Sequence, residues 1–209
     1  VPYKVRSSKY LLIKNEKSQS PLSFTPEDTI HSFAVSFLVK TKDNGTIAAI
    51  IGDTRSSAIK LDKGKIVYKA TNGLDIALDT TSESKGWQYI VLSHQFASGK
   101  TSLFINGNLA GSIIEKILVR KIVVGGNGGV VNMLSAPIEA GYKDLLIFRS
   151  SLNIDEAKAL YYDQLLQSSL EIYTPLNDNN FVSGTSATNY AQSLSKLMIQ
   201  GESLTSKDN

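Results

Sequence analysis

The chain of 209 residues contains no cysteine, two histidines and one tryptophan. Without cysteine it can form no disulfide, no thiol nucleophile and no zinc-thiolate site. Its histidines, His31 and His94, are too few and too far apart in the sequence to suggest a histidine-rich transition-metal site. Oxygen ligands are available, so calcium is the metal that this composition could hold.

Long apolar runs and dense blocks of one charge are also missing. No stretch reaches the ~18 apolar residues that a membrane helix needs. The formal charge is +3, and no compact basic cluster indicates a nucleic-acid partner. Hydrophobic residues make up 42% of the chain, an ordinary share that excludes a disordered protein. We therefore expect a folded domain with no membrane span and no nucleic-acid partner.

Apolar residues recur at every second position along most of the chain, which is the pattern of half-buried strands. In residues 32–40, for example, Phe and Val alternate with Ser, Ala and Lys. Short turns rich in Gly, Asn and Asp separate about ten to twelve such segments, with no helix between them. Because parallel strands need crossover helices, the sequence predicts an all-β fold, a two-sheet antiparallel jelly-roll sandwich.

One short helix is expected near the C-terminal end, over residues 153–166. Asn153 as the N-cap and Glu156 three residues later form the pattern of a capping box. An apolar stripe along this segment should pack on the sandwich. We assign residues 1–170 to the sandwich and residues 171–209 to a C-terminal extension that packs on it and frays at its end.

Three separated segments resemble one family of sandwich domains. The first is the strand W-Q-Y-I-V-L-S-H-Q-F that begins at Trp87, and the second is T-S-L-F-I-N-G-N-L-A-G-S. The third contains a family pattern of closing strand and helix at Gly141, Asp144, Phe148, Leu152 and Glu156. Over residues 10–167 the chain resembles the laminin-G-like domains of the concanavalin-A-like lectin and glucanase superfamily. The resemblance implies a jelly-roll fold and an extracellular, cell-surface or periplasmic location.

Trp87 begins a strand, and we expect its indole to seal the core against the opposite sheet. Catalytic members of the superfamily carry Glu-x-Asp-x-x-Glu on one strand, which aims the carboxyls of a glycosidase into one groove. No glutamate in this chain has an aspartate two residues later. We therefore lean against an enzyme, while a glycoside hydrolase or lyase with an atypical site stays open.

Four residues are candidate ligand contacts. Arg55 follows a buried strand and could meet a sugar hydroxyl or carboxylate. Asn127 and Asn132 lie in a glycine-rich excursion, and such loops form the rim of a sandwich, where ligands bind. Tyr68 could offer an aromatic ring to a sugar. For each of them an ordinary structural role is the alternative.

Three aspartates are candidate calcium ligands, namely Asp43, Asp53 and Asp144. Asp43 begins an Asp-Asn-Gly turn, Asp53 follows a strand, and Asp144 matches the aspartate of the family's closing strand. None belongs to a dense D-x-D-x-D cluster, so turn and structural roles remain alternatives.

We predict a non-catalytic binding module. A glycan is the first candidate ligand and a protein surface the second, while a structural or protein-interaction spacer domain is a further alternative. Because the chain opens without Met or a signal peptide, we expect a mature or excised portion of an exported, multidomain protein.

Overall fold

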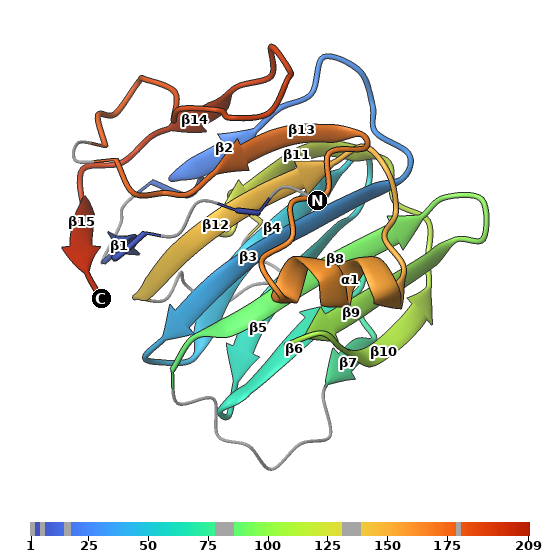
Figure 1. Cartoon of the computed structure of the whole chain (residues 1–209). Helices are drawn as coiled ribbons and strands as arrows, with labels where there is room; N and C mark the ends of the chain where they lie inside the picture. Colours follow the sequence, from blue (N-terminus) through green and yellow to red (C-terminus); the bar gives the residue numbers. More distant parts are fainter. Residues whose placement is uncertain (1–2, 5–6, 15–17, 78–85, 131–138, 179–180) are drawn as a thin grey trace.

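The computed structural model describes residues 3–4, 7–14, 18–77, 86–130, 139–178 and 181–209. Two antiparallel sheets face each other (Figure 1). The eight-stranded sheet contains, in spatial order, β10 (Asn108–Ile114), β9 (Lys100–Ile105), β8 (Gln88–Gln95), β3 (Phe33–Thr41), β12 (Ala140–Phe148), β1 (Lys9–Ile13) and β15 (Leu204–Asp208), with β13 (Leu170–Thr174) also paired to β12. The seven-stranded sheet contains β14 (Leu197–Ile199), β2 (Leu22–Phe24), β11 (Val119–Val124), β4 (Gly45–Gly52), β5 (Ser56–Asp62), β6 (Lys65–Lys69) and β7 (Asp75–Ala77).

The connectivity is that of a jelly-roll sandwich, as the sequence predicted. Local hairpins join β5 to β6, β8 to β9 and β9 to β10. Local connections also join β4 to β5 and β6 to β7, whereas β3 lies between β8 and β12, which are distant from it in sequence. The fold class is therefore confirmed: two antiparallel sheets with one short helix toward the C-terminal end of the described chain.

The main core fills the space between the sheets. Along β3, Phe33, Val35, Phe37 and Val39 are buried there, in the alternation that the sequence shows. Burying one such side chain contributes roughly 1.5–3 kcal/mol. Tyr142 of β12 crosses the core, and its hydroxyl donates a hydrogen bond to the carbonyl of Ile47 on the opposite sheet at 2.9 Å.

The helix α1 (Ile154–Tyr161) begins with the predicted capping box. The Asn153 side chain accepts from the Glu156 N–H at 2.9 Å, and the Asn153 N–H donates to the Glu156 carboxylate at 3.1 Å. The predicted extension to residue 166 is wrong, because the chain turns at Asp163, where φ is +64°, and leaves the helix. The helix lies across the outer face of the eight-stranded sheet (Figure 1) and buries Ala157 and Leu160 there.

Trp87 does not seal the core, which corrects the prediction made for it. Its half-buried ring lies on the outer face of the eight-stranded sheet, 5.2 Å from the Tyr10 ring in an edge-on contact. The ammonium group of Lys143 lies 4.7 Å from the centroid of the same ring. Gly141 leaves room for the indole, since a Cβ there would lie 3.1 Å from it.

Residues 170–209 contribute strands to both sheets. β13 pairs with β12, and β14 pairs with β2 in the other sheet. The end that was expected to fray forms β15, which pairs with β1 from Lys9 opposite Asp208 to Ile13 opposite Leu204.

Candidate functional site

The structure brings two of the predicted residues together. Asp53 and Arg55 line one pocket of about 230 Å³, with Phe96 and Lys116 across from them. The Asp53 carboxylate is already engaged, because it forms an ion pair with Arg120. The Arg55 side chain is exposed.

The three candidate calcium ligands are not brought together. Asp43 lies in an exposed turn before β4, whereas Asp53 follows the other end of that strand. Asp144 belongs to β12 in the opposite sheet. Within the described ranges no group of three or more His, Asp or Glu side chains could hold a metal ion.

Asp144 has an unusual environment for a carboxyl group. It adopts φ of +50° at an irregularity in the pairing of β12 with β3. Burial raises the pKa of Asp144 to about 6, although the nearby charges of Lys4 and Lys143 oppose that shift. A raised pKa disfavours the ionised form that a calcium ligand needs.

The remaining candidates lie inside the molecule or outside the described residues. Tyr68 is fully buried, and its hydroxyl donates to the Glu115 carboxylate at 2.7 Å. Its position on β6 points the ring into the core, so it cannot stack on a ligand at the surface. Asn127 is buried and its side chain accepts from the Gly129 N–H at 3.0 Å, which fixes the loop. Asn132 lies outside the described residues.

A second pocket, of about 400 Å³, is formed where the chain after α1 meets the segment before β14. We call it the Tyr190 pocket, and its polar lining consists of Gln167, Ser169, Glu171, Tyr190, Gln192 and Ser193. The Tyr190 side chain is 56% exposed, and its ring lies 6.1 Å from that of Tyr173. An exposed aromatic ring thus stands beside hydroxyl, amide and carboxylate groups.

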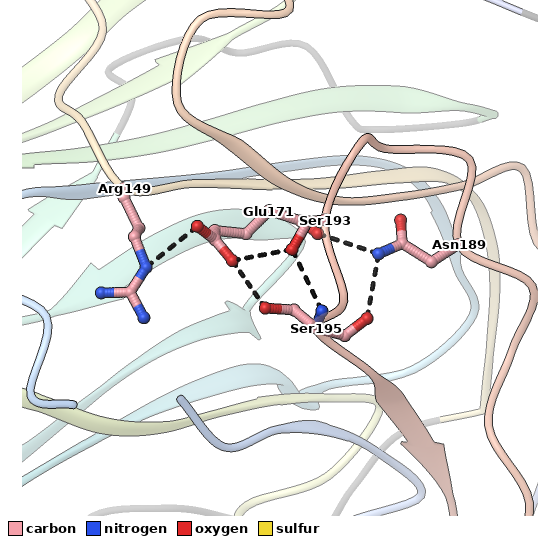
Figure 2. Close-up of polar contacts among 5 residues, drawn as sticks. All are labelled: Arg149, Glu171, Asn189, Ser193 and Ser195. Carbon is pink, nitrogen blue, oxygen red and sulfur yellow. Dashed lines mark hydrogen bonds and ion pairs between the residues drawn. The ribbon is translucent and has the colours of Figure 1, made fainter. Parts of the chain in front are cut away.

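Three donors hold the Glu171 carboxylate in place (Figure 2). Arg149 Nε donates to Oε1 at 3.0 Å, while the hydroxyls of Ser193 and Ser195 donate to Oε2 at 3.1 and 2.6 Å. These three bonds orient the carboxylate without using all its acceptor capacity. Oε1 accepts one bond from the described chain and can accept another.

Asn189 fixes the backbone on both sides of this carboxylate. Its Nδ2 donates to the carbonyls of Glu171 and Ser195 at 2.9 and 3.0 Å (Figure 2). Its Oδ1 accepts from the N–H groups of Tyr173 and Ala191 at 2.9 and 3.0 Å. All four bonding positions of the side chain are used, so the loop that presents Tyr190 is pre-organised.

A third pocket, of about 430 Å³, opens beside the start of α1. Three of its four serine hydroxyls are paired: Ser102 with Ser112 at 2.8 Å, and Ser93 with the N–H and carbonyl of Leu152. In the Tyr190 pocket, by contrast, the side chains of Gln167, Tyr190 and Gln192 make no hydrogen bond within the described chain. The Tyr190 pocket therefore offers more unused polar groups to a ligand.

Sequence reasoning missed the Tyr190 pocket. Its residues come from a region without clear periodicity, and the segments that form it are joined by tertiary contacts. The one available signal was Asn189-Tyr190 followed by Ser193 and Ser195, a cluster of aromatic, amide and hydroxyl groups.

No helix among the described residues has the length and apolarity required to cross a bilayer.

No protein-family model matches the sequence, and no curated protein matches it. Solved structures do match its fold. A putative carbohydrate binding protein from Bacteroides ovatus ATCC 8483 aligns with a TM-score of 0.71 and 14% identity, over 96% of this chain and 59% of that chain. A heptameric SAP-like pentraxin from Limulus polyphemus aligns with a TM-score of 0.55 and 13% identity, over 92% of this chain and 94% of that one.

The binding domain of botulinum neurotoxin serotype D aligns with a TM-score of 0.51 and 19% identity, over 80% of this chain and 46% of that one. The chain therefore spans less than two thirds of the Bacteroides protein and about half of the neurotoxin domain. At these identities the likeness concerns the fold. It defines the chain as an all-β jelly-roll sandwich.

Proposed function

We propose that this domain is a non-catalytic carbohydrate-binding module and that the Tyr190 pocket holds a neutral sugar. The observation that carries the proposal is the exposed Tyr190 ring beside the buttressed Glu171 carboxylate. The C–H face of a sugar can pack on the tyrosine ring, and its hydroxyls can donate to Oε1 of Glu171. The amides of Gln167 and Gln192 can donate to, and accept from, further hydroxyls.

The make-up of the pocket supports binding rather than hydrolysis. Glycosidases of the common design need two carboxyl groups that flank the scissile bond. Glu171 is the single carboxylate in the described lining of this pocket, so the second carboxyl group of that design is missing there. The Bacteroides protein of similar fold is a putative carbohydrate binding protein, which supports this proposal.

The setting of the domain is also part of the proposal. We place it in an exported multidomain protein, at an extracellular, cell-surface or periplasmic location, as a member of the laminin-G-like branch of the concanavalin-A-like superfamily. The match to part of the longer Bacteroides protein is consistent with a module joined to others. A cell-fractionation experiment on the parent protein checks the location.

Calorimetry with neutral oligosaccharides tests the binding. We expect one of maltohexaose, cellohexaose, laminarihexaose and xylohexaose to bind without release of reducing sugar. Y190A should weaken that binding about tenfold, because 1.4 kcal/mol of lost packing corresponds to that factor. Y162A is the matched control, since Tyr162 is 69% exposed and lies outside this pocket. Equal affinity of Y190A and the parent protein, or no binding of any of the four sugars, would reject the proposal.

A further inference from the structure

We infer that the pocket around Arg55, at a different place from the Tyr190 pocket, is a second ligand site that takes a carboxylate-bearing sugar residue, a hexuronic acid. This inference rests on the proposed function, because it takes the ligand to be a glycan.

Two segments that are distant in sequence are tied together beside this pocket. The turn between β4 and β5 carries Arg55, and its backbone is closed by a hydrogen bond from the Gly52 N–H to the Arg55 carbonyl at 3.0 Å. A second bond, from the Asp53 N–H to the Leu118 carbonyl at 3.2 Å, attaches this turn to the segment before β11. A Cβ on Gly52 would lie 2.4 Å from the Arg55 carbonyl oxygen, so the turn requires glycine at that position. Arg55 is therefore presented by a fixed backbone.

The charges in this pocket do not balance. Asp53 is neutralised by Arg120, whose guanidinium binds its carboxylate. Arg55 and Lys116 make no side-chain hydrogen bond or ion pair within the described part of the chain. Two cations thus face the pocket with their donors unused. A guanidinium binds a carboxylate through two parallel N–H···O bonds, so a carboxylate is the group that this arrangement fits.

The opposite wall is apolar and partly aromatic. Phe96 lies just after β8, and its ring is held edge-on by His31, with 4.8 Å between ring centroids. The Phe96 N–H donates to the Ser32 hydroxyl at 3.0 Å, which fixes the backbone as well. Ile117 is buried behind the same wall. A ligand with a carboxylate at one end can bind the two cations, and an apolar C–H face on the same ligand can pack on the Phe96 ring.

The size of the pocket limits the ligand. Its volume of about 230 Å³ is below the ~300–1,000 Å³ of sites for drug-sized ligands. We therefore assign it to a single charged sugar residue of a longer glycan, with the rest of the glycan outside the pocket.

Titration of the whole domain with three small probes, followed by ¹H–¹⁵N NMR, tests this site. Glucuronic acid should shift the resonances of residues 53–55 and 116–118, together with Arg55 Nε. Glucose, which lacks the carboxylate, and acetate, which lacks the ring, should bind at least about tenfold more weakly at this place. Equal binding of acetate would reduce the site to one for carboxylate alone and would overturn the assignment to a sugar. Equal binding of glucose would overturn the role of the charge.

Substitutions in the protein test the same site. R55Q should weaken glucuronic acid binding tenfold or more, and R55K should restore part of it, since lysine keeps the charge without the paired donors. K42Q is the matched control: Lys42 is an exposed cation near the other end of β4. A retained spectrum of R55Q shows that the variant is folded. Unchanged affinity in R55Q would overturn the inference.

The experiments can reject the proposal for one pocket without rejecting the proposal for the other. Shifts at residues 53–55 with glucuronic acid, in a protein that binds none of the neutral oligosaccharides, would reject the Tyr190 pocket and keep this one. Binding of a neutral oligosaccharide that Y190A abolishes, without any effect of glucuronic acid at Arg55, would do the reverse.

Discussion

The ammonium group of Lys4 lies 4.3 Å from the centroid of the Tyr89 ring, buried against the outer face of the eight-stranded sheet. It donates hydrogen bonds to the Tyr89 hydroxyl at 3.2 Å and to the Leu160 carbonyl at 2.7 Å. One lysine thus connects the N-terminal segment to both β8 and α1. Burial lowers the pKa of Lys4, and the charges of Asp144 and Asp163 oppose that shift.

We expect K4A to lower the free energy of unfolding by about 2 kcal/mol, since it removes a packed stem and two hydrogen bonds. K4M should recover most of the loss, because it keeps the stem and removes a buried charge whose desolvation is costly. Urea denaturation measures both. K14A, at an exposed lysine, should stay within about 0.5 kcal/mol of the parent protein. A K4M variant as unstable as K4A would show that the charge, not the packing, holds the segment.

Asp144 should give the protein a dependence of stability on pH. Its pKa is about 6 in the folded chain against an ordinary 3.8, so the unfolded chain loses this proton first as the pH rises. Its contribution to stability is therefore largest below about pH 4 and is lost between pH 4 and 6.

D144N should remove this loss and raise the free energy of unfolding at pH 7 by up to about 3 kcal/mol. Asparagine tolerates the positive φ of this position, so the backbone is not strained. Denaturation curves from pH 4 to 7 provide the check, with D43N in an exposed turn as the control. The same pH profile in D144N and the parent protein would contradict the role given to this group.

His94 should have the opposite effect on the pH profile. It is buried beside Phe33, and its Nδ1 lies 2.8 Å from the Thr101 hydroxyl, while Nε2 has no partner in the described chain. Burial lowers the pKa of His94, so below its ordinary value of 6.5 the unfolded chain binds a proton that the folded chain does not. Stability from this group is therefore lost as the pH falls through 6.5.

H94F keeps an aromatic ring on Phe33 and removes the titration. The stability of H94F relative to the parent protein should therefore increase as the pH is lowered from 7 to 5. Denaturation at the two pH values measures it. A constant difference between the proteins would mean that the pKa of His94 is the same in the folded and unfolded chain, and would contradict this prediction.

Asn189 should control the loop that carries Tyr190. N189A removes four hydrogen bonds, and we expect a loss of about 2 kcal/mol together with faster proteolysis within residues 181–196. Limited proteolysis with mass spectrometry locates the cleavage. N108A is the control, since Asn108 is exposed at the start of β10. Cleavage at equal rates in the two variants would show that Asn189 does not keep this loop ordered.

Alternation was a sufficient guide to most strands but not to which face of a strand is buried. On β8, Ile90 and Leu92 point to the main core, while Tyr89 and Val91 are buried under α1 on the other face. Both faces are apolar, so the parity of Trp87 could not be assigned from the sequence. In the structure, α1 covers the outer face of β8 and buries Tyr89 and Val91 there, and Trp87 lies on that same face.

The candidate site was less predictable than the fold. Arg55 and Asp53 could be named because they follow a recognisable strand, and the structure places them in one pocket. Strands β14 and β15 have three and five residues, which is too short for a clear period, and each pairs with a strand near the start of the chain. The Tyr190 pocket depends on such long-range placement, so local sequence carries little trace of it.

The position of Trp87 gives the molecule a built-in optical reporter. It is the chain's single indole, and its edge contact to Tyr10 ties its surroundings to strand β1. Since β1 also pairs with β15, release of either end of the chain should change the polarity around this ring. Its fluorescence can therefore follow the attachment of both chain ends without any label.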